Sequence, residues 1–150
     1  MKKSDFGAPA PSASSRPEIT KAVTRGVQRW FVDLGFAPIL EFPLSNQKRV
    51  DVVGLGPKSE IWMVEVKSGI ADFVTDQKWP EYLDYADQFF FAVDPDFPQE
   101  KLPTAPGLIV ADAFGAALVR PAPLAPIASA RRKKIVLDLA RLAAWRALRV

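Results

Sequence analysis

Apolar residues between Pro17 and Leu34 recur every three to four positions, which predicts an amphipathic helix over this range. Ser15 and Glu18 fit a capping box at the start of this helix, and Pro17 suits its first turn. Gly35 indicates where the helix stops. The residues on the predicted apolar stripe are Ile19, Val23, Val27, Trp30, Phe31 and Leu34.

Three strand-like runs follow this helix, at residues 37–44, 49–55 and 60–67. Pro43 indicates that the first run ends early or lies at the edge of a sheet. The third run has apolar residues on both of its faces, as in a strand that is buried on both faces. Because the gaps between the runs are short, we expect an antiparallel meander.

The second half of the chain alternates between helical and strand-like patterns. The stretch QFFFAVD is typical of a buried strand, and the stripe of Ile135, Leu139 and Leu142 predicts a C-terminal helix. In chain order, the pattern predicts helices at 71–77 and 80–86, a strand at 88–94, a proline-rich loop at 95–106, strands at 107–111 and 116–119, and a helix at 129–148.

Helices and strands are thus mixed along the chain, which predicts an α/β (α+β) domain with a mixed central sheet flanked by helices. The 150 residues suffice for one domain, and an apolar fraction of 49% suffices for a packed core. We expect a disordered leader over residues 1–15 and a single domain over 16–150. The leader lacks the apolar stretch of a secretory signal, and no stretch reads as a membrane span, so we expect a cytoplasmic protein.

The chain contains no cysteine and no histidine. This composition excludes disulfides, thiolate metal sites, cysteine nucleophiles and histidine bases. A metal ion would have to be held by oxygen ligands, which suit Mg²⁺ or Mn²⁺. Catalysis would depend on carboxylates, lysines, hydroxyl groups and metal-bound water.

Three charged residues stand inside apolar strand patterns. Glu65 and Lys67 are two positions apart near the end of the third predicted strand, so their side chains share a face. If the second and third strands pair as a meander, Asp51 comes beside Glu65. Two adjacent carboxylates repel each other unless a proton or a cation separates them, and a divalent ion or Lys67 would resolve the conflict.

These three residues suit the hydrolysis of a phosphodiester. A metal ion held by Asp51 and Glu65 would lower the pKa of a bound water and polarise a phosphate oxygen. Lys67 would orient that water or stabilise the charge that builds on the phosphoryl group. The spacing of these three residues alone is common, so a surface salt bridge is the competing interpretation. Such a salt bridge would stabilise the protein by at most about 1 kcal/mol. The strand–turn–strand context with apolar flanks favours the site.

The same segments resemble a known family. With Asp51 on the second strand and Glu65-Val-Lys67 on the third, the chain resembles the PD-(D/E)XK nuclease superfamily. Val50 stands where the proline of that name is expected. More narrowly, residues 17–148 resemble the MmcB-like family of bacterial DNA-repair proteins. The stretches that carry the resemblance are PEIT (17–20), RVDVVGL (49–55), EIWMVEVKSGIADF (60–73), DQKWPEYLDYAD (76–87), FAVDPDFP (91–98) and GLIVAD (107–112).

The resemblance implies a restriction-endonuclease-like αβββαβ core and a metal-dependent endonuclease of DNA repair, with Mg²⁺ or Mn²⁺ as cofactor. It implies damaged, branched or single-stranded DNA as the partner, association with the nucleoid, and contact with other DNA-repair proteins. A homodimer is plausible by the same resemblance. Two other functions stay open: a non-catalytic DNA-binding subunit of a repair complex, and a nuclease that acts on RNA.

The resemblance also extends the candidate site. Glu18 stands where many superfamily relatives have an additional acidic metal ligand, whereas the capping box gives it a competing role. Gln77 and Lys78 belong to a segment whose polar residues support the site or contact DNA in relatives. Ser68 is either a helix cap or a phosphate contact, and Glu41 either reaches the site or is solvated.

Positive charge is concentrated near the C-terminus, although the net charge of the chain is only +3. Residues 131–149 hold seven Arg or Lys residues against a single acid, Asp138. This segment is either a phosphate-binding surface or a solvated helix face. The candidate DNA contacts within it are Arg131, Arg132, Lys133 and Lys134.

Overall fold

The structure is a computed structural model, and it describes residues 14–70 and 78–149. The predicted helix at 71–77, with Gln77, and most of the predicted leader lie outside these residues. The described elements are helix α1 (Arg16–Asp33), strands β1 (Ala37–Pro43), β2 (Arg49–Leu55) and β3 (Ile61–Val66), the 3₁₀ helix η1 (Trp79–Tyr82), strand β4 (Gln88–Val93), the 3₁₀ helix η2 (Gln99–Lys101), strands β5 (Gly107–Asp112) and β6 (Gly115–Arg120), and helix α3 (Ser129–Leu148).

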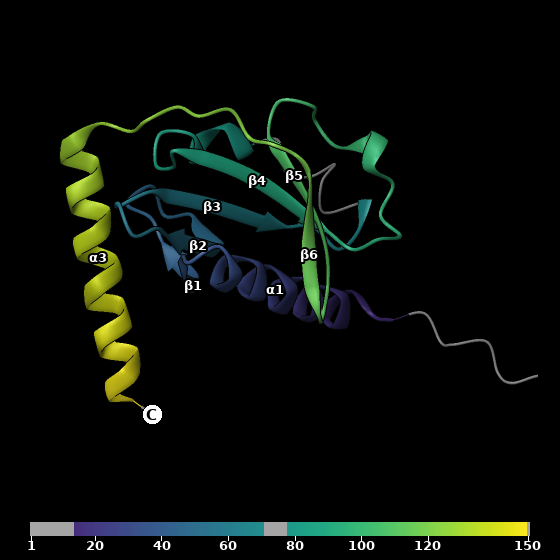
Figure 1. Cartoon of the computed structure of the whole chain (residues 1–150), viewed down its shortest axis with the longest axis horizontal. Helices are drawn as coiled ribbons and strands as arrows, with labels where there is room; N and C mark the ends of the chain where they lie inside the picture. Colours follow the sequence, from purple (N-terminus) through teal and green to yellow (C-terminus); the bar gives the residue numbers. More distant parts are fainter. Residues whose placement is uncertain (1–13, 71–77, 150) are drawn as a thin grey trace, which may run out of the picture.

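The strands form one six-stranded sheet in which they follow each other in chain order. β1, β2 and β3 pair antiparallel, which confirms the predicted meander. β4 and β5 run parallel to β3, and β6 returns antiparallel to β5. The predicted mixed sheet with flanking helices is therefore confirmed as an open α+β arrangement (Figure 1).

The predicted helix at 80–86 is wrong. A 3₁₀ helix of four residues, Trp79–Tyr82, stands there, and bends and turns follow it. The rings of Trp79 and Tyr82 both stack on Phe89 of β4, with ring centroids 6.1 and 5.3 Å apart. Aromatic packing onto the sheet, rather than an amphipathic stripe, therefore determines the shape of this segment.

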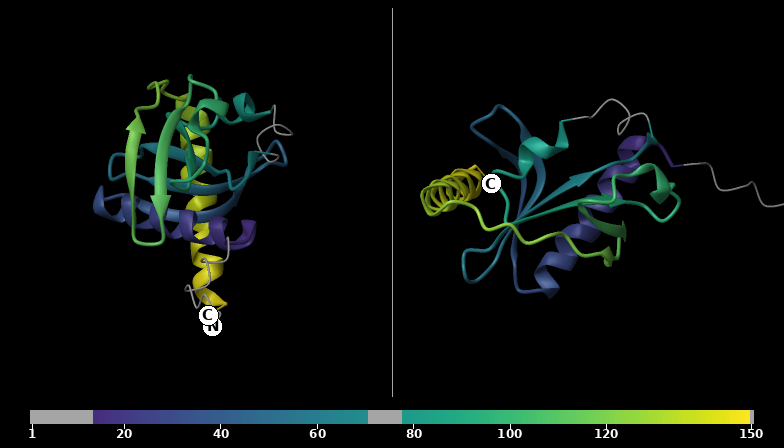
Figure 2. Two further views of the ribbon diagram at one scale, coloured as in Figure 1. Left: turned by 90° about the vertical axis from the view of Figure 1, so that its right-hand side faces the viewer. Right: turned by 90° about the horizontal axis from the view of Figure 1, so that it is seen from above.

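α1 lies along one face of the sheet (Figure 2). A glycine, Gly26, permits its close approach. A Cβ at Gly26 would lie 2.0 Å from the backbone oxygen of Asp112 and 2.6 Å from that of Gly115. Any larger residue would push α1 away from the β5–β6 hairpin. The core between α1 and the sheet consists of Val23, Val27, Phe31, Phe36, Val52, Val64, Val66, Phe90, Ala92, Ile109, Ala111 and Ala122.

α3 packs at one end of the opposite face of the sheet. Ile135 and Leu139 are its buried residues, and they join a core rich in phenylalanine. The C-terminal end of α3 projects beyond the strands (Figure 1). Within residues 14–70 and 78–149, no helix combines the length and the apolar character that a membrane span requires.

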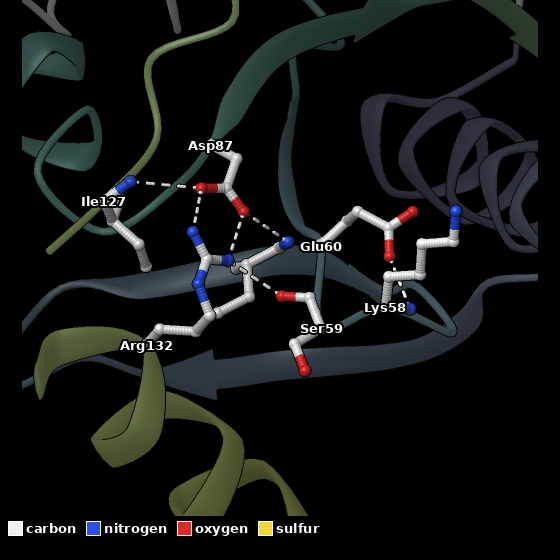
Figure 3. A network of polar contacts seen from close by, with 7 residues as sticks. Lys58, Ser59, Glu60, Asp87, Ile127 and Arg132 are labelled. Atoms are coloured by element: carbon white, nitrogen blue, oxygen red, sulfur yellow. Dashed lines mark hydrogen bonds and ion pairs between the residues drawn. The ribbon is translucent and has the colours of Figure 1, made fainter. Parts of the chain in front are cut away.

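A partly buried ion pair holds α3 to the sheet (Figure 3). Arg132 in the first turn of α3 donates two hydrogen bonds of 2.6 Å to the two carboxylate oxygens of Asp87. The same carboxylate accepts the backbone N–H groups of Ile61 and Ile127 at 2.9 and 3.1 Å. Arg132 also donates to the backbone oxygen of Ser59. The structure thus gives Arg132, which the sequence suggested as a DNA contact, a role in the fold.

The environment of Asp87 favours its charged form. Burial alone would raise the pKa of the Asp87 carboxyl group. The hydrogen bonds from Arg132 and from two backbone N–H groups, together with the arginine charge, outweigh the burial and lower the pKa below its ordinary value of 3.8. The ion pair is therefore formed throughout the neutral pH range.

Candidate active site

Asp51 and Glu65 lie side by side on neighbouring strands. The register pairs Val52 of β2 with Val64 of β3, which sets Asp51 opposite Glu65. The N–H of Asp51 donates to Oε1 of Glu65 at 3.2 Å, and the N–H of Val66 donates to Oδ2 of Asp51 at 2.7 Å. Each carboxylate therefore binds the backbone of the other's strand.

Glu65 and Lys67 are buried although both side chains are ionisable. Glu65 is 7% exposed and Lys67 is 6% exposed. The N–H of Lys67 donates to the backbone oxygen of Ala92 in β4 at 2.9 Å, which continues the parallel pairing past the end of β3. Buried charges in proteins are paired or coordinate metal ions. This burial argues against the competing interpretation of a surface salt bridge.

β1 is distorted directly opposite Asp51. Glu41 has a φ of +48°, and the pairing of β1 with β2 skips Glu41 and Asp51 between two regular pairs. Ile39 and Phe42 consequently pack against the same core, although a regular strand would direct them to opposite faces. The distortion interrupts the strand alternation at the point where the half-buried Asp51 meets the edge of the sheet.

Asp51 lines a cleft of about 280 Å³ between α1, β1 and α3. Thr20 and Thr24 stand one turn apart on the α1 wall of this cleft. Arg146 of α3 contributes a positive charge to it. The residues that line this Asp51 cleft are Thr20, Thr24, Leu40, Glu41, Asp51 and Arg146.

A second cleft, of about 660 Å³, follows the start of α1 and shares Thr20 with the Asp51 cleft. Arg16 and Lys21 give it positive charge. Ser68, which follows β3 and Lys67, also lines this cleft, and its role as a phosphate contact stays a prediction. Lys78 is exposed just before η1.

Glu18 does not join the two carboxylates. Its N–H donates to the hydroxyl of Ser15 at 3.3 Å, so Ser15 caps α1 as the sequence predicts. Among residues 14–70 and 78–149, no group of three acidic side chains is close enough to hold one metal ion. The described residues therefore do not group Glu18 with Asp51 and Glu65, and its role as a third ligand stays a prediction.

The basic residues at the start of α3 differ in their partners and in their exposure to solvent. Arg132 is held by Asp87, and Arg131 donates to the backbone oxygen of Asp84 while its guanidinium lies over the ring of Tyr85. Lys134 pairs with Asp138 one turn further along the helix, at 2.9 Å. Arg131, Lys133 and Lys134 are exposed, which fits both a phosphate-binding surface and a solvated helix face.

Sequence reasoning missed three residues of the Asp51 cleft. Thr20 and Thr24 carry a weak signal, because their spacing of four puts both hydroxyls on one side of the predicted helix. Arg146 belongs to the basic segment 131–149, but no sequence signal links it to Asp51, from which it lies far away in the sequence.

The pair of carboxylates fits a hard divalent ion. Mg²⁺ is commonly held by one or two carboxylates, while water and phosphate oxygens complete its shell. The backbone N–H groups bound to Asp51 and Glu65 fix the orientation of both carboxylates, as supporting contacts do around metal ligands. Asp51 and Glu65 are therefore the residues that would hold such an ion.

The chain has relatives among known proteins. Residues 8–150 match the family described as DNA repair protein MmcB-like. A solved structure of SPO1766, a protein of unknown function from Silicibacter pomeroyi, is 47% identical to this chain, with a TM-score of 0.83. That match covers 87% of this chain and 91% of the other chain. Among curated proteins, no sequence matches. Because the family match extends over nearly the whole sequence, the chain belongs to the MmcB-like family of DNA repair proteins.

Proposed function

We propose that this protein is a metal-dependent endonuclease of the PD-(D/E)XK type that hydrolyses DNA phosphodiester bonds during repair. The observation that carries the proposal is the reciprocal pair of hydrogen bonds that joins the strands of Asp51 and Glu65 through their carboxylates. Lys67, buried at the end of the strand that bears Glu65, completes the set. The family match supplies the context of DNA repair.

The proposed division of labour follows from the positions of these residues. When bound, Mg²⁺ or Mn²⁺ supplies Lewis acidity and a water of lowered pKa. Asp51 and Glu65 are oriented by backbone N–H groups, so their carboxylates need little reorganisation during the reaction. The ammonium group of Lys67 would orient the attacking water or stabilise the negative charge that develops on the phosphoryl oxygens.

The two clefts support a nucleic-acid substrate. They share Thr20, so they adjoin each other along α1. Arg16 and Lys21 contribute positive charge to one cleft, and Arg146 to the other. Because neutralised phosphates dominate the affinity of proteins for nucleic acids, this distribution fits a polynucleotide better than a small phosphate ester.

The test is a cleavage assay over duplex, single-stranded and branched DNA and matching RNAs, each with Mg²⁺, with Mn²⁺ and with EDTA. We expect metal-dependent cleavage of at least one DNA structure and none in EDTA. Cleavage of RNA alone would instead support a nuclease that acts on RNA. Binding of DNA without cleavage under any of these conditions would support a non-catalytic subunit of a repair complex, and either result would overturn the proposal.

A further inference from the structure

We propose that the C-terminal helix α3 forms part of the active site and that its Arg146 binds a phosphate of the nucleic-acid backbone next to Asp51. This inference rests on the proposed function, because it names a substrate contact of the same site. Three observations carry it: the hydrogen bonds of Arg146, the distortion of β1, and the composition of the Asp51 cleft.

Arg146 reaches from α3 to the edge of the sheet. Its Nη1 donates to the backbone oxygen of Leu40, and its Nη2 donates to the backbone oxygen of Glu41 at 2.9 Å. A guanidinium group carries five N–H donors in a fixed plane, more than these two carbonyls use. Arg146 is thereby held in one orientation while donors remain for an anion.

Arg146 binds β1 at the position where this strand is distorted. At Glu41 the backbone enters the left-handed region, with a φ of +48°, which few residues other than glycine adopt readily. The ladder with β2 is interrupted at the same position, between the pairs that flank Glu41 and Asp51. The two carbonyls that Arg146 binds belong to Glu41 and to the residue before it. Local strain of this kind is concentrated at functional sites.

The composition of the cleft explains why a cation is needed there. Glu41 and Asp51 both line it, so a phosphate that approaches Asp51 meets two carboxylates. Arg146 offsets this repulsion at the same wall, and arginine keeps its charge at every relevant pH. Thr20 and Thr24 line the cleft from α1, and their hydroxyl groups would add neutral donors for phosphate oxygens.

The test compares two arginines of the same helix. Arg146→Gln and Arg141→Gln remove the same charge from α3, but Arg141 is exposed and does not line the Asp51 cleft. Affinity for a labelled DNA duplex is measured over a salt series in Ca²⁺, which permits binding without turnover in the assay.

We expect Arg146→Gln to bind about tenfold more weakly than wild type, with the slope of log affinity against log salt reduced by about 0.9. Arg141→Gln should retain the wild-type affinity to within about twofold. Equal losses in both variants would show a general attraction to α3 and overturn the inference.

A purely structural role for Arg146 would give a different result. Loosening of α3 alone would lower the melting temperature. It would not remove a phosphate contact, so the number of counterions released on binding, and with it the salt slope, would stay the same. An unchanged salt slope in Arg146→Gln would therefore overturn the inference even if affinity fell. The double variant Thr20→Val with Thr24→Val provides a second probe. It should weaken binding while keeping the wild-type slope, because hydroxyls carry no charge.

The result separates this inference from the proposed function. If wild type cleaves DNA and Arg146→Gln binds and cleaves as well as Arg141→Gln, the inference fails and the endonuclease stands. If wild type never cleaves but Arg146→Gln alone loses affinity and slope, the phosphate contact stands and the endonuclease fails. If wild type binds no DNA at any salt concentration, both fail.

Discussion

At the scale of single residues, the site depends on two carboxylates that hold each other through the backbone. The N–H of Asp51 binds Glu65, and Asp51 in turn binds the N–H of Val66. Both hydrogen bonds are therefore accepted by side-chain carboxyl oxygens and donated by backbone N–H groups of the neighbouring strand. Both carboxyl groups therefore take part in the hydrogen bonding between β2 and β3, which fixes their positions before any substrate binds.

Among the three site residues, Lys67 is the one whose replacement should slow DNA cleavage with the least effect on DNA binding. Lys67→Met keeps a long apolar stem in a buried place but removes the ammonium group. We expect the turnover of DNA to fall by at least about 100-fold, because a group that stabilises developing charge is lost. The KM should change little. The measurement is a steady-state cleavage assay with Mg²⁺.

Lys101→Met is the matched control for this prediction. Lys101 is exposed in η2 and lines neither cleft of the proposed site. Its replacement should leave turnover within about twofold of wild type. Equal turnover in wild type and Lys67→Met would remove Lys67 from the catalytic set.

At the scale of elements, α3 is held at both ends by arginines. Arg132 binds Asp87 at its start, and Arg146 binds the β1 carbonyls near its end. Between them Ile135 and Leu139 are buried against the sheet. A helix held in this way keeps a fixed position relative to the edge of the sheet that carries Asp51.

Arg132→Gln should destabilise the protein by about 3 kcal/mol, because it leaves the carboxylate of Asp87 buried without its charged partner. Urea unfolding at neutral pH measures this difference. Lys134→Gln, which removes an exposed ion pair on the same helix, should cost at most about 0.5 kcal/mol. Comparable losses in the two variants would show that the Asp87 pair does not hold α3.

Gly26→Ala should destabilise the packing of α1 on the β5–β6 hairpin. The added Cβ would meet two backbone oxygens that cannot move aside like a side-chain end. We expect a net loss of about 2 kcal/mol, since overpacking outweighs the better helix propensity of alanine. Chemical unfolding measures the loss. A more stable variant would mean that α1 can shift away from the hairpin at no cost.

The elements that the sequence predicted well are those in which local pattern and tertiary contacts agree. The three meander strands match their predicted ranges closely, since short apolar runs separated by tight turns leave few other pairings. The same pairing made the approach of Asp51 to Glu65 predictable. For η1 the prediction failed, because the aromatic rings of Trp79 and Tyr82 pack on Phe89 instead of forming a helical stripe.

Contacts between distant residues could not be predicted from spacing. The Asp87–Arg132 pair and the hydrogen bonds of Arg146 to β1 depend on where the chain places α3, which no local pattern records. The sequence left open whether Glu41 reaches the site or is solvated, and its backbone conformation became visible only in the fold. Which arginines of a basic helix hold the fold together therefore becomes apparent only once the packing of that helix is known.

At the scale of the whole molecule, the lowered pKa of Asp87 makes stability depend on pH. Because the pKa is lower in the folded than in the unfolded state, the ion pair stabilises the protein at neutral pH. This contribution is lost as the pH falls below the ordinary carboxyl pKa and through the lowered folded value.

Urea unfolding of wild type and Asp87→Asn from about pH 7 to about pH 3 tests this dependence. We expect the advantage of wild type to be largest near neutrality and to shrink below about pH 4, since asparagine does not titrate in this range. An advantage that stays constant down to the lowest pH would show that the charge of Asp87 does not contribute.

The central claim is that Asp51 and Glu65 form a metal-dependent site for DNA hydrolysis, and one comparison tests it most directly. The cleavage rate of Asp51→Asn is measured as Mg²⁺ is titrated, on the DNA structure that wild type cleaves best, beside wild type and the control Asp96→Asn. Asp96 is exposed in the loop after β4, so its replacement should leave the rate unchanged. We predict a loss of at least about 100-fold for Asp51→Asn in a protein that still unfolds cooperatively. A wild-type rate in Asp51→Asn at every Mg²⁺ concentration would contradict the claim.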